Sequence, residues 1–310
     1  MFRTKQYRYT NEQVVLTLTL LLVMAVVVLT STITFCLSGV FILAMFVISW
    51  ALIRSHHQSL LRGAIPVNSN QMPELAAMVD ECAIKLQPGP VETFIVSRRQ
   101  LNAYTFGIEN PKGLVLFQPL LRVMNAGELK FIIGHEMGHV ALGHTWLNTI
   151  IGGMAGIPAP FGASVLLYSA FRWWNRMCEF SADRAGLLAC GDLNFAIAAL
   201  VKLIAPEVRT QQEFEQILSM MAAKQRDASS RMVEVFKSHP MLGRRVAQLR
   251  EFSQTRLYQE LQKGVDHNIT RVKAKVLQKA EEVERMAASP QSIEESEKTA
   301  EERWPWLARK

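Results

Sequence analysis

The sequence has few cysteines, and their spacing suggests no role for them. Its 310 residues include four cysteines, no two of which form a Cys-x-x-Cys pair: Cys36, Cys82, Cys178 and Cys190. In a cytoplasmic domain they should be free thiols, and no cysteine nucleophile is expected. The chain also lacks an internal repeat. Its formal net charge of +7 is not gathered into a basic stripe with interleaved aromatics, so no nucleic-acid partner is expected.

Charged side chains are missing from residues 14 to 53, which are almost wholly apolar. One membrane span needs about 20 such residues, so this run is about twice the necessary length. Small and polar residues from Thr30 to Gly39 favour a turn in its middle. We therefore expect residues 1–57 to form a membrane anchor of two transmembrane helices. A cleaved signal peptide is the alternative, which the length and the lack of a small-x-small cleavage site disfavour.

Basic residues flank this apolar run on both sides. Arg3, Lys5 and Arg8 precede it, Arg54 and Arg62 follow it, and the turn between has none. The positive-inside rule then predicts that both ends lie in the cytoplasm. We expect a multi-pass protein of the plasma membrane whose large domain after the anchor faces the cytoplasm. The excess of positive charge suits a domain close to an anionic lipid bilayer, although it could also be merely solubilising.

Two histidines and a glutamate form a His-Glu-x-x-His motif at His135, Glu136 and His139. Residues four apart share a helix face, so the two imidazoles can bind one metal ion from the same side. Glu136 lies beside them, where it can accept a proton from the attacking water. Asn125 and Glu128 form a capping box that predicts where the helix begins. Two ordinary helical histidines are the alternative.

A catalytic zinc site needs a third protein ligand and one open position. The metzincin pattern is excluded, because Leu142 and Thr145 stand where that class needs glycine and histidine. His144 is near, but a five-residue step from His139 turns away from the ligand face.

Glu179 is the better candidate for the third ligand. It falls in a second helical segment with apolar neighbours, a costly setting for unpaired charge. Asp183 follows one turn later, where it can orient a ligand histidine. We therefore expect one Zn²⁺ per chain, held by His135, His139 and Glu179.

Four motifs in this order resemble a known family, the membrane zinc metalloproteases typified by HtpX and the CAAX prenyl protease. The resemblance covers roughly residues 75 to 250. The motifs are Asn102-Ala103-Tyr104, the HExxH with a trailing His144, the pair Glu179 and Asp183 with Arg176 upstream, and Ser238-His239-Pro240 followed by Arg245 and Leu249.

The resemblance implies roles for the first and last of these motifs. Asn102, Ala103 and Tyr104 would form an edge strand that holds the substrate extended. His239 would be catalytic and stabilise the oxyanion, and Arg245 would support it. Alone, a Ser-His-Pro sequence more often marks a turn before a helix.

A second apolar stretch, residues 146–171, separates the two groups of ligands. A single span here would place His139 and Glu179 on opposite sides of the membrane, and the stretch is too short for two spans. We expect a re-entrant or interfacial hairpin or a buried lid, which departs from the two spans that the resemblance implies. Trp173 and Trp174 after it suit either interface anchors or domain core.

The sequence patterns in the rest of residues 58–262 predict a mainly α-helical domain with a small β-sheet. We expect an α+β fold of the zincin type. By resemblance this is the gluzincin arrangement, whose exposed sheet edge can bind a peptide by strand addition. The predicted features are a helix over residues 71–87, strands at 93–97 and 113–117, a turn between neighbouring strands at 110–113, a helix from Asp192 to about Ile204, and a capping box at Thr210 and Glu213.

Residues 263–310 form a charged tail with an apolar stripe at helical spacing. A solvated helix with a loose end is one interpretation. The other is an arm that binds a coiled-coil partner.

Together these patterns predict a membrane-anchored zinc endopeptidase with Glu136 as its general base. Its substrates would be membrane or misfolded proteins, as in protein quality control, by anchoring and by resemblance. A non-catalytic, zinc-stabilised scaffold is one alternative, but it needs a fourth ligand, for which only His144 is near. Prenyl-peptide processing is the other, and it needs an enclosed chamber built from more spans than this chain offers.

Overall fold

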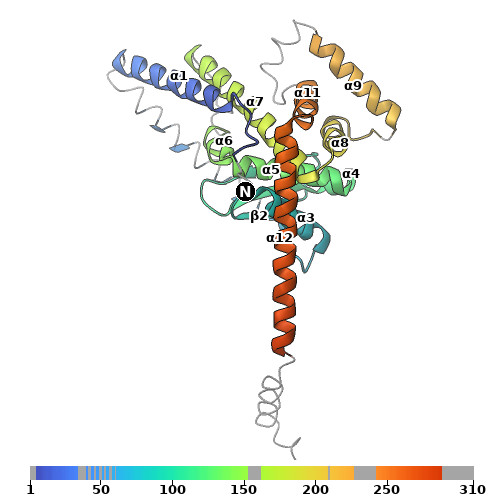
Figure 1. The fold of residues 1–310 in the computed structure, drawn as a ribbon. Helices are drawn as coiled ribbons and strands as arrows, with labels where there is room; N and C mark the ends of the chain where they lie inside the picture. Colours follow the sequence, from blue (N-terminus) through green and yellow to red (C-terminus); the bar gives the residue numbers. More distant parts are fainter. Residues whose placement is uncertain are drawn as a thin grey trace, which may run out of the picture. The chain divides into compact units, whose positions relative to one another are not determined.

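The computed structural model describes residues 5–33, 61–152, 162–208, 210–226 and 242–287, with scattered positions between 40 and 59. Helices dominate it, which confirms the predicted mainly helical fold with a small sheet. The elements in chain order (Figure 1) are α1 (Glu12–Ile33), β1 (Ile65–Pro66), α3 (Pro73–Leu86), β2 (Val91–Val96), β3 (Ala103–Phe106), β4 (Lys112–Phe117), α4 (Gln118–Val123), α5 (Ala126–Ala141), α6 (His144–Gly152), α7 (Gly162–Cys190), α8 (Leu193–Ile204), α9 (Gln211–Arg226), α11 (Leu242–Ser253) and α12 (Arg256–Ala287).

The sheet has four strands in the order β1-β2-β4-β3. β2 and β4 are parallel neighbours, while β1 and β3 pair antiparallel at the two edges. The predicted turn near Pro111 joins β3 to β4, not β2 to β4. Parallel strands cannot be joined by a tight turn, so the chain must leave β2 and form β3 before it returns as β4. This path leaves β3 at an edge.

α5 is the central helix of the domain and contacts α3, α7, α8 and the strands β3 and β4. It begins at the predicted capping box. The Asn125 side chain accepts from the Glu128 amide at 2.9 Å, and the Glu128 carboxylate accepts from the Asn125 amide at 2.9 Å. The second predicted box is also present, with Thr210 and Glu213 bonded to each other's amides ahead of α9.

α5 and α7 approach so closely that glycine is required between them. A Cβ atom added to Gly134 would lie 2.3 Å from the Cβ of Ala189. One added to Gly138 would lie 2.5 Å from the Cβ of Ala185. Real Cβ contacts are not this short, so any larger residue would push the two helices apart. The close contact brings the histidine face of α5 against α7.

α1 packs along α7, and the two helices lie side by side in Figure 1. The buried face of α1 carries Glu12, Val15 and Thr19, which are three and four residues apart. Thr19 Oγ1 donates to the carbonyl oxygen of Ala170 at 3.3 Å. Val15 packs against Trp174 of α7. One narrow face of α1 is therefore buried against the domain, and the rest of its surface is not.

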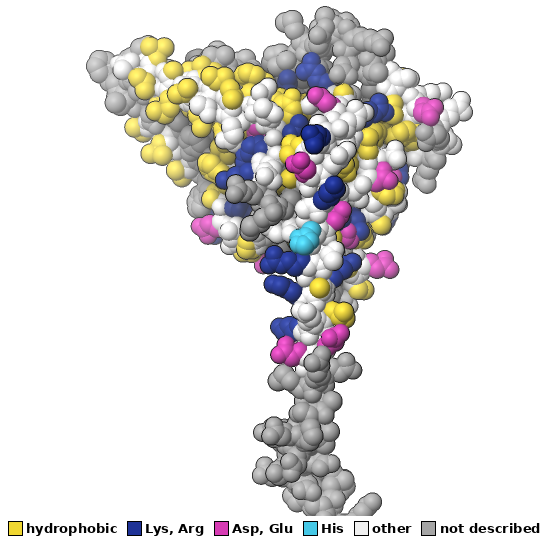
Figure 2. Space-filling model, viewed as in Figure 1, with side chains coloured by type: hydrophobic (Ala, Val, Ile, Leu, Met, Phe, Trp, Pro, Cys, Tyr) yellow, Lys and Arg dark blue, Asp and Glu magenta, His cyan; other side chains and the backbone are white. Residues whose placement is uncertain are grey.

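The outer face of α1 is apolar and exposed, as the hydrophobic surface over this helix in Figure 2 shows. Within the described segments one helix is long and apolar enough to cross a membrane, Glu12–Leu29, with a mean hydropathy of 2.4 and 17% of it buried. Its exposed apolar side chains are Val14, Leu18, Leu20, Leu21, Met24, Val28 and Leu29. Most of the second helix of the predicted anchor lies outside the described residues.

The second apolar stretch is helical on both sides of residues 153–161, which are outside the described residues. It contributes α6 and the first part of α7. Of the two tryptophans after it, Trp174 is 2% exposed and belongs to the core, whereas Trp173 is 47% exposed. Core packing is therefore confirmed for Trp174, and an interface role stays a prediction for Trp173.

Residues Asp266–Lys310 form a compact unit separate from Met1–Val265. α12 crosses this boundary. Its first turns belong to the core of the first unit, where Leu261 and Val265 are 3% and 0% exposed. In the second unit Val276 and Leu277 are exposed on the same helix.

Candidate metal centre

α5 presents His135 and His139 from adjacent turns of one helix face. Their Nε2 atoms are 3.2 Å apart, and each residue is 7% exposed. Glu136 is also nearly buried and lines the cleft beside them. The buried length of α5 therefore carries all three polar residues of the HExxH motif into the interior.

α7 brings Glu179 against both histidines. Its Oε1 lies 3.5 Å from Nε2 of His139, and its Oε2 lies 3.6 Å from Nε2 of His135. Ligand atoms around a tetrahedral zinc ion with bonds of about 2.0–2.2 Å are about 3.3–3.6 Å apart. Two imidazole nitrogens and one carboxylate oxygen, all within 4.8 Å of one another, thus fit a zinc ion in both geometry and ligand type.

Asp183 contacts the opposite side of the His135 ring. Its Oδ1 lies 3.0 Å from Nδ1 of His135. An ionised carboxylate only accepts hydrogen bonds, so Nδ1 carries the hydrogen and the lone pair of Nε2 faces Glu179. Burial opposes the charge of Asp183, but Arg245 and His135 outweigh it and hold the pKa of Asp183 below its ordinary value.

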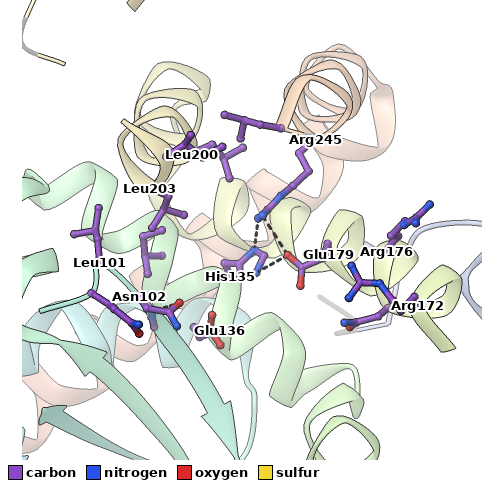
Figure 3. Close-up of a pocket in the computed structure, with 16 residues that line it drawn as sticks. Leu101, Asn102, His135, Glu136, Arg172, Arg176, Glu179, Leu200, Leu203 and Arg245 are labelled. Atoms are coloured by element: carbon purple, nitrogen blue, oxygen red, sulfur yellow. Dashed lines mark hydrogen bonds and ion pairs between the residues drawn. The ribbon is translucent and has the colours of Figure 1, made fainter. Parts of the chain in front are cut away.

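Arg245 of α11 bonds to both carboxylates of α7, Asp183 and Glu179, and Figure 3 shows it beside Glu179. Its Nε donates to Oδ2 of Asp183 at 2.7 Å, and its Nη1 lies 3.2 Å from Oε2 of Glu179. Burial opposes the charge of Glu179, yet Arg245 and the two histidines keep the pKa of Glu179 well below its usual range. Both carboxylates are therefore ionised at neutral pH. The predicted oxyanion residue His239 lies outside the described residues.

His144 is not one of the three converging donors. Its Nδ1 lies 3.0 Å from Nδ1 of His139, the nitrogen that does not face Glu179. Burial lowers the pKa of His144 to about 4, against the opposing effect of Glu12, so this histidine is neutral at physiological pH. The contact with Glu12 links two residues that are 132 positions apart, and sequence reasoning did not find it.

A cleft of about 490 Å³ opens over the metal centre. Its lining residues include Gln100, Leu101, Asn102, Ala103, Glu136, Arg172, Asn175, Arg176, Leu200, Leu203 and Arg245. Figure 3 shows Arg172 and Arg176 on one side of His135, with Leu200 and Leu203 on the other. The arginines precede Glu179 by seven and three residues, a helical spacing that could have indicated their place.

Two of the three predicted substrate-binding residues, Asn102 and Ala103, line this cleft. Tyr104 is not among the residues that line it. Its ring packs at 6.0 Å, between centroids, against Phe117 of β4.

A buried HExxH helix beside a second helix that carries a glutamate is the arrangement typical of metallopeptidases of the gluzincin type. Residues 69–253 match peptidase family M48, and the chain belongs to this family. The name of the family implies a peptidase, and one relative is named a metallopeptidase.

Individual relatives are distant. The chain is 26% identical over 223 residues to the plastoglobule-localized metallopeptidase 48, chloroplastic, of Arabidopsis thaliana, covering 67% of this chain and 64% of that protein. It is 26% identical over 181 residues to a protease HtpX homolog of Caldanaerobacter subterraneus, covering 56% and 58%. It is 27% identical over 218 residues to protease HtpX of Hydrogenovibrio crunogenus, covering 59% and 71%. The chain thus spans less than two thirds of the length of the first two relatives.

Proposed function

We propose that this protein is a membrane-anchored zinc endopeptidase. The observation that carries the proposal is the convergence of His135, His139 and Glu179 beside Glu136 in an open cleft. Three protein ligands leave a position for water, as a catalytic zinc site requires. A structural site would need a fourth protein ligand, and His144 instead contacts the outer nitrogen of His139.

In the proposed reaction the polar residues of the site have separate roles. Zinc, when bound, supplies a Lewis acid that polarises the attacking water and the scissile carbonyl. The Glu136 carboxylate accepts a proton from the water and passes it to the leaving amine nitrogen. Asp183 holds the hydrogen of His135 at Nδ1, so that Nε2 remains free to bind. Arg245 keeps Glu179 ionised and fixes its direction. His239 would stabilise the oxyanion.

The peptide substrate would bind in extended form along β3. In the described sheet this strand is paired with β4 on one side only, and Asn102 and Ala103 at its start line the cleft. An edge strand binds a peptide through its backbone, so it accepts many sequences. This mode suits membrane or misfolded polypeptides as substrates and a role in protein quality control.

The apolar exposed surface of α1 supports the membrane anchor. Leu21, Met24 and Leu29 are each at least 60% exposed on a helix that is long enough to span a bilayer. We expect the protein to stay in the membrane pellet after alkaline carbonate extraction. A two-helix anchor with both ends in the cytoplasm further predicts that tags at both termini are protected in sealed right-side-out cells. Release by carbonate would contradict the anchor.

The catalytic proposal is tested by comparing the wild type with Glu136→Gln after purification in detergent. Both proteins should contain about one zinc per chain, because residue 136 is not a ligand. Casein cleavage should fall about 10²–10⁴-fold in the variant, the usual contribution of a general base. Glu74→Gln, which changes an exposed carboxylate at the start of α3, is the matched control and should cleave normally.

Other outcomes would contradict parts of the proposal. Absence of zinc from both proteins would exclude the metal site. Equal zinc with no casein cleavage by either protein would favour the scaffold, unless a farnesylated peptide is cleaved, which would favour prenyl-peptide processing.

A further inference from the structure

A second cluster of buried polar side chains lies behind the metal centre. Donor atoms of Glu12, His144 and Cys178 lie within 4.8 Å of one another, a spacing that would allow a second metal site. However, Glu12 is already bonded to Arg8 and Ser181. A guanidinium beside the carboxylate repels a divalent cation. The cluster is therefore better described as a hydrogen-bond network centred on Glu12.

This network continues without a break to a metal-centre histidine. Nε2 of His144 lies 2.9 Å from Oε1 of Glu12, and Nδ1 of His144 lies 3.0 Å from Nδ1 of His139. The three residues are 0%, 2% and 7% exposed, in the order Glu12, His144 and His139. A chain of three buried side chains thus connects the first residue of α1 to the HExxH helix.

The Glu12 carboxylate acts only as an acceptor in this network. Ser181 Oγ accepts from the Tyr9 amide at 2.8 Å and donates to Oε2 of Glu12, which is nearer than its other acceptor, the carbonyl oxygen of Met177 at 3.3 Å. The Arg8 guanidinium pairs with Oε1. Both oxygens therefore receive hydrogen bonds, and neither carries a hydrogen.

The direction of the remaining bonds follows from this assignment. His144 must donate to Glu12 from Nε2, which leaves a lone pair on Nδ1 of the neutral ring. His139 must then donate from Nδ1 to that lone pair. The Nε2 lone pair of His139 is left facing Glu179, 3.5 Å away. Asp183 likewise keeps the hydrogen of His135 on Nδ1, so that the Nε2 lone pair of His135 also faces Glu179.

We propose that His144 and Glu12 form a positioning relay for the metal ligand His139, so that the membrane helix α1 contributes to the metal centre. The relay fixes the tautomer and the direction of the ring, as carboxylates behind ligand histidines do in other metal sites. It rests on the proposed function, because it assumes that His135, His139 and Glu179 hold zinc. Glu12 and His144 are positioning residues and do not touch the metal or the substrate.

The segment before α1 is fixed firmly enough to serve this role. Nη2 of Arg8 donates to the carbonyl oxygen of Leu142, just after α5, at 2.7 Å. Nη1 of Arg184 on α7 donates to the carbonyl oxygen of Arg8 at 3.3 Å. The segment before α1 is therefore bonded to α7 and to the residue that directly follows α5. A displacement of α1 would break the relay and weaken metal binding.

The test measures zinc affinity of the full-length protein in detergent by competition with a chromogenic chelator. Glu12→Gln and His144→Gln should each weaken zinc binding about ten- to hundredfold. The double variant should be no weaker than the weaker single variant, because both changes break one chain. By contrast, Glu12→Gln combined with Asp183→Asn should be additive, because these residues act on different histidines.

Thr19→Val is the matched control. Thr19 is a buried residue of the same face of α1 and also bonds to α7, but it has no link to His139. This variant should bind zinc like the wild type. The absorption spectrum of bound Co²⁺ should change in the Glu12 and His144 variants and not in the Thr19 variant, which a merely structural role would not produce.

Each outcome decides between the relay and its absence. Zinc affinity within twofold of the wild type in both single variants, or full additivity in the double variant, would overturn the relay. If Glu12→Gln does not fold, the affinity and Co²⁺ spectrum of folded His144→Gln decide alone. A wild type that binds no zinc would instead overturn the proposed function. This outcome can be told from failure of the relay, because it is seen in the wild type alone, before any variant is compared with it.

Discussion

Two nearby carboxylates, Glu179 and Glu136, change the affinity of His139 for protons. Burial alone would lower the pKa of His139, but Glu179 and Glu136 outweigh burial and raise it above its ordinary value. Glu179 remains ionised far below neutral pH. Over the range around neutrality, protonation of a histidine therefore decides whether the three donors can accept a cation.

This charge distribution predicts that zinc binding weakens on acidification. A ligand histidine must be neutral, and the raised pKa means that protons compete at a higher pH than for an isolated imidazole. Zinc affinity should fall by about tenfold per pH unit once the pH drops below the pKa of His139. Chelator competition between about pH 8 and about pH 5 measures this.

Far-UV circular dichroism over the same pH range provides the control for unfolding. Constant zinc affinity in a folded protein would contradict the prediction. Loss of zinc together with loss of helical signal would assign the effect to the fold rather than to His139.

At the scale of elements, the α5–α7 contact positions the ligands. Glycines at 134 and 138 face alanines of α7, and each glycine is adjacent to a residue of the HExxH motif. The distance between the two helices and the distance between Glu179 and the histidines are therefore set by the same contact. Packing at these glycines should affect metal binding as well as stability.

We predict that Gly138→Ala is destabilising and impairs zinc binding. The added Cβ would lie 2.5 Å from the Cβ of Ala185, which is fixed to the α7 backbone and cannot rotate away. Overpacking of this kind costs about 1–3 kcal/mol in the free energy of unfolding. Thermal unfolding and zinc content measure both effects.

Gly63→Ala is the matched control, because a Cβ at Gly63 would meet nothing within 4 Å. It should leave both quantities near the wild-type values. If Gly138→Ala were as stable and as rich in zinc as Gly63→Ala, the close approach of α5 and α7 would be wrong.

An ion-pair bridge joins α3 to α5 on another side of the HExxH helix. Glu81 lies 2.8 Å from Nζ of Lys85 and 2.6 Å from Nζ of Lys130. Partial burial opposes the charge of Glu81, but the two lysines outweigh it and lower the pKa of Glu81 below its ordinary value. A carboxylate with a lowered pKa stabilises the folded state above its unfolded pKa, and this stabilisation is lost as the pH falls through the folded pKa.

Glu81→Gln should therefore reduce the free energy of unfolding by about 1 kcal/mol at neutral pH, a modest effect because the pair is partly exposed. The difference from the wild type should disappear at a pH below the lowered pKa of Glu81. Urea unfolding at several pH values measures this, with the exposed Glu92→Gln as control. A difference that persists unchanged in acid would show that the charge is not responsible.

At the scale of the whole molecule, the boundary within α12 separates two units of different character. Leu261 and Val265 are buried in the first unit, whereas the helix beyond Asp266 exposes apolar side chains such as Val276. The first unit should therefore not need the second in order to fold.

We predict that a chain ending after Val265 unfolds within a few degrees of the full-length protein. A chain ending after Thr255 also loses Leu261 and Val265, and burial of each is worth about 1.5–3 kcal/mol. It should be about 3–6 kcal/mol less stable or fail to fold. Thermal unfolding of both truncations in the same detergent makes the comparison. Equal destabilisation by the two truncations would show that the boundary between the two units does not lie after Val265.

Local sequence patterns predicted much of the helical framework and part of the candidate site. Helical spacing places His135 and His139 on one face, and capping boxes mark the starts of α5 and α9, because these features depend on residues within one or two turns. The apolar setting of Glu179 pointed to a buried carboxylate for the same local reason. Family membership followed from four motifs in order.

Tertiary structure decided the features that depend on distant segments. The parallel pairing of β2 with β4 leaves β3 at the edge, and the Tyr104 ring packs against Phe117 and does not line the cleft. Glu12 reaches His144 across 132 residues only because α1 packs on α7. The sequence by itself determined the fold class and the HExxH helix, since short-range periodicity is written in consecutive residues. The partners behind the histidines were decided by the packing of helices, which no local pattern encodes.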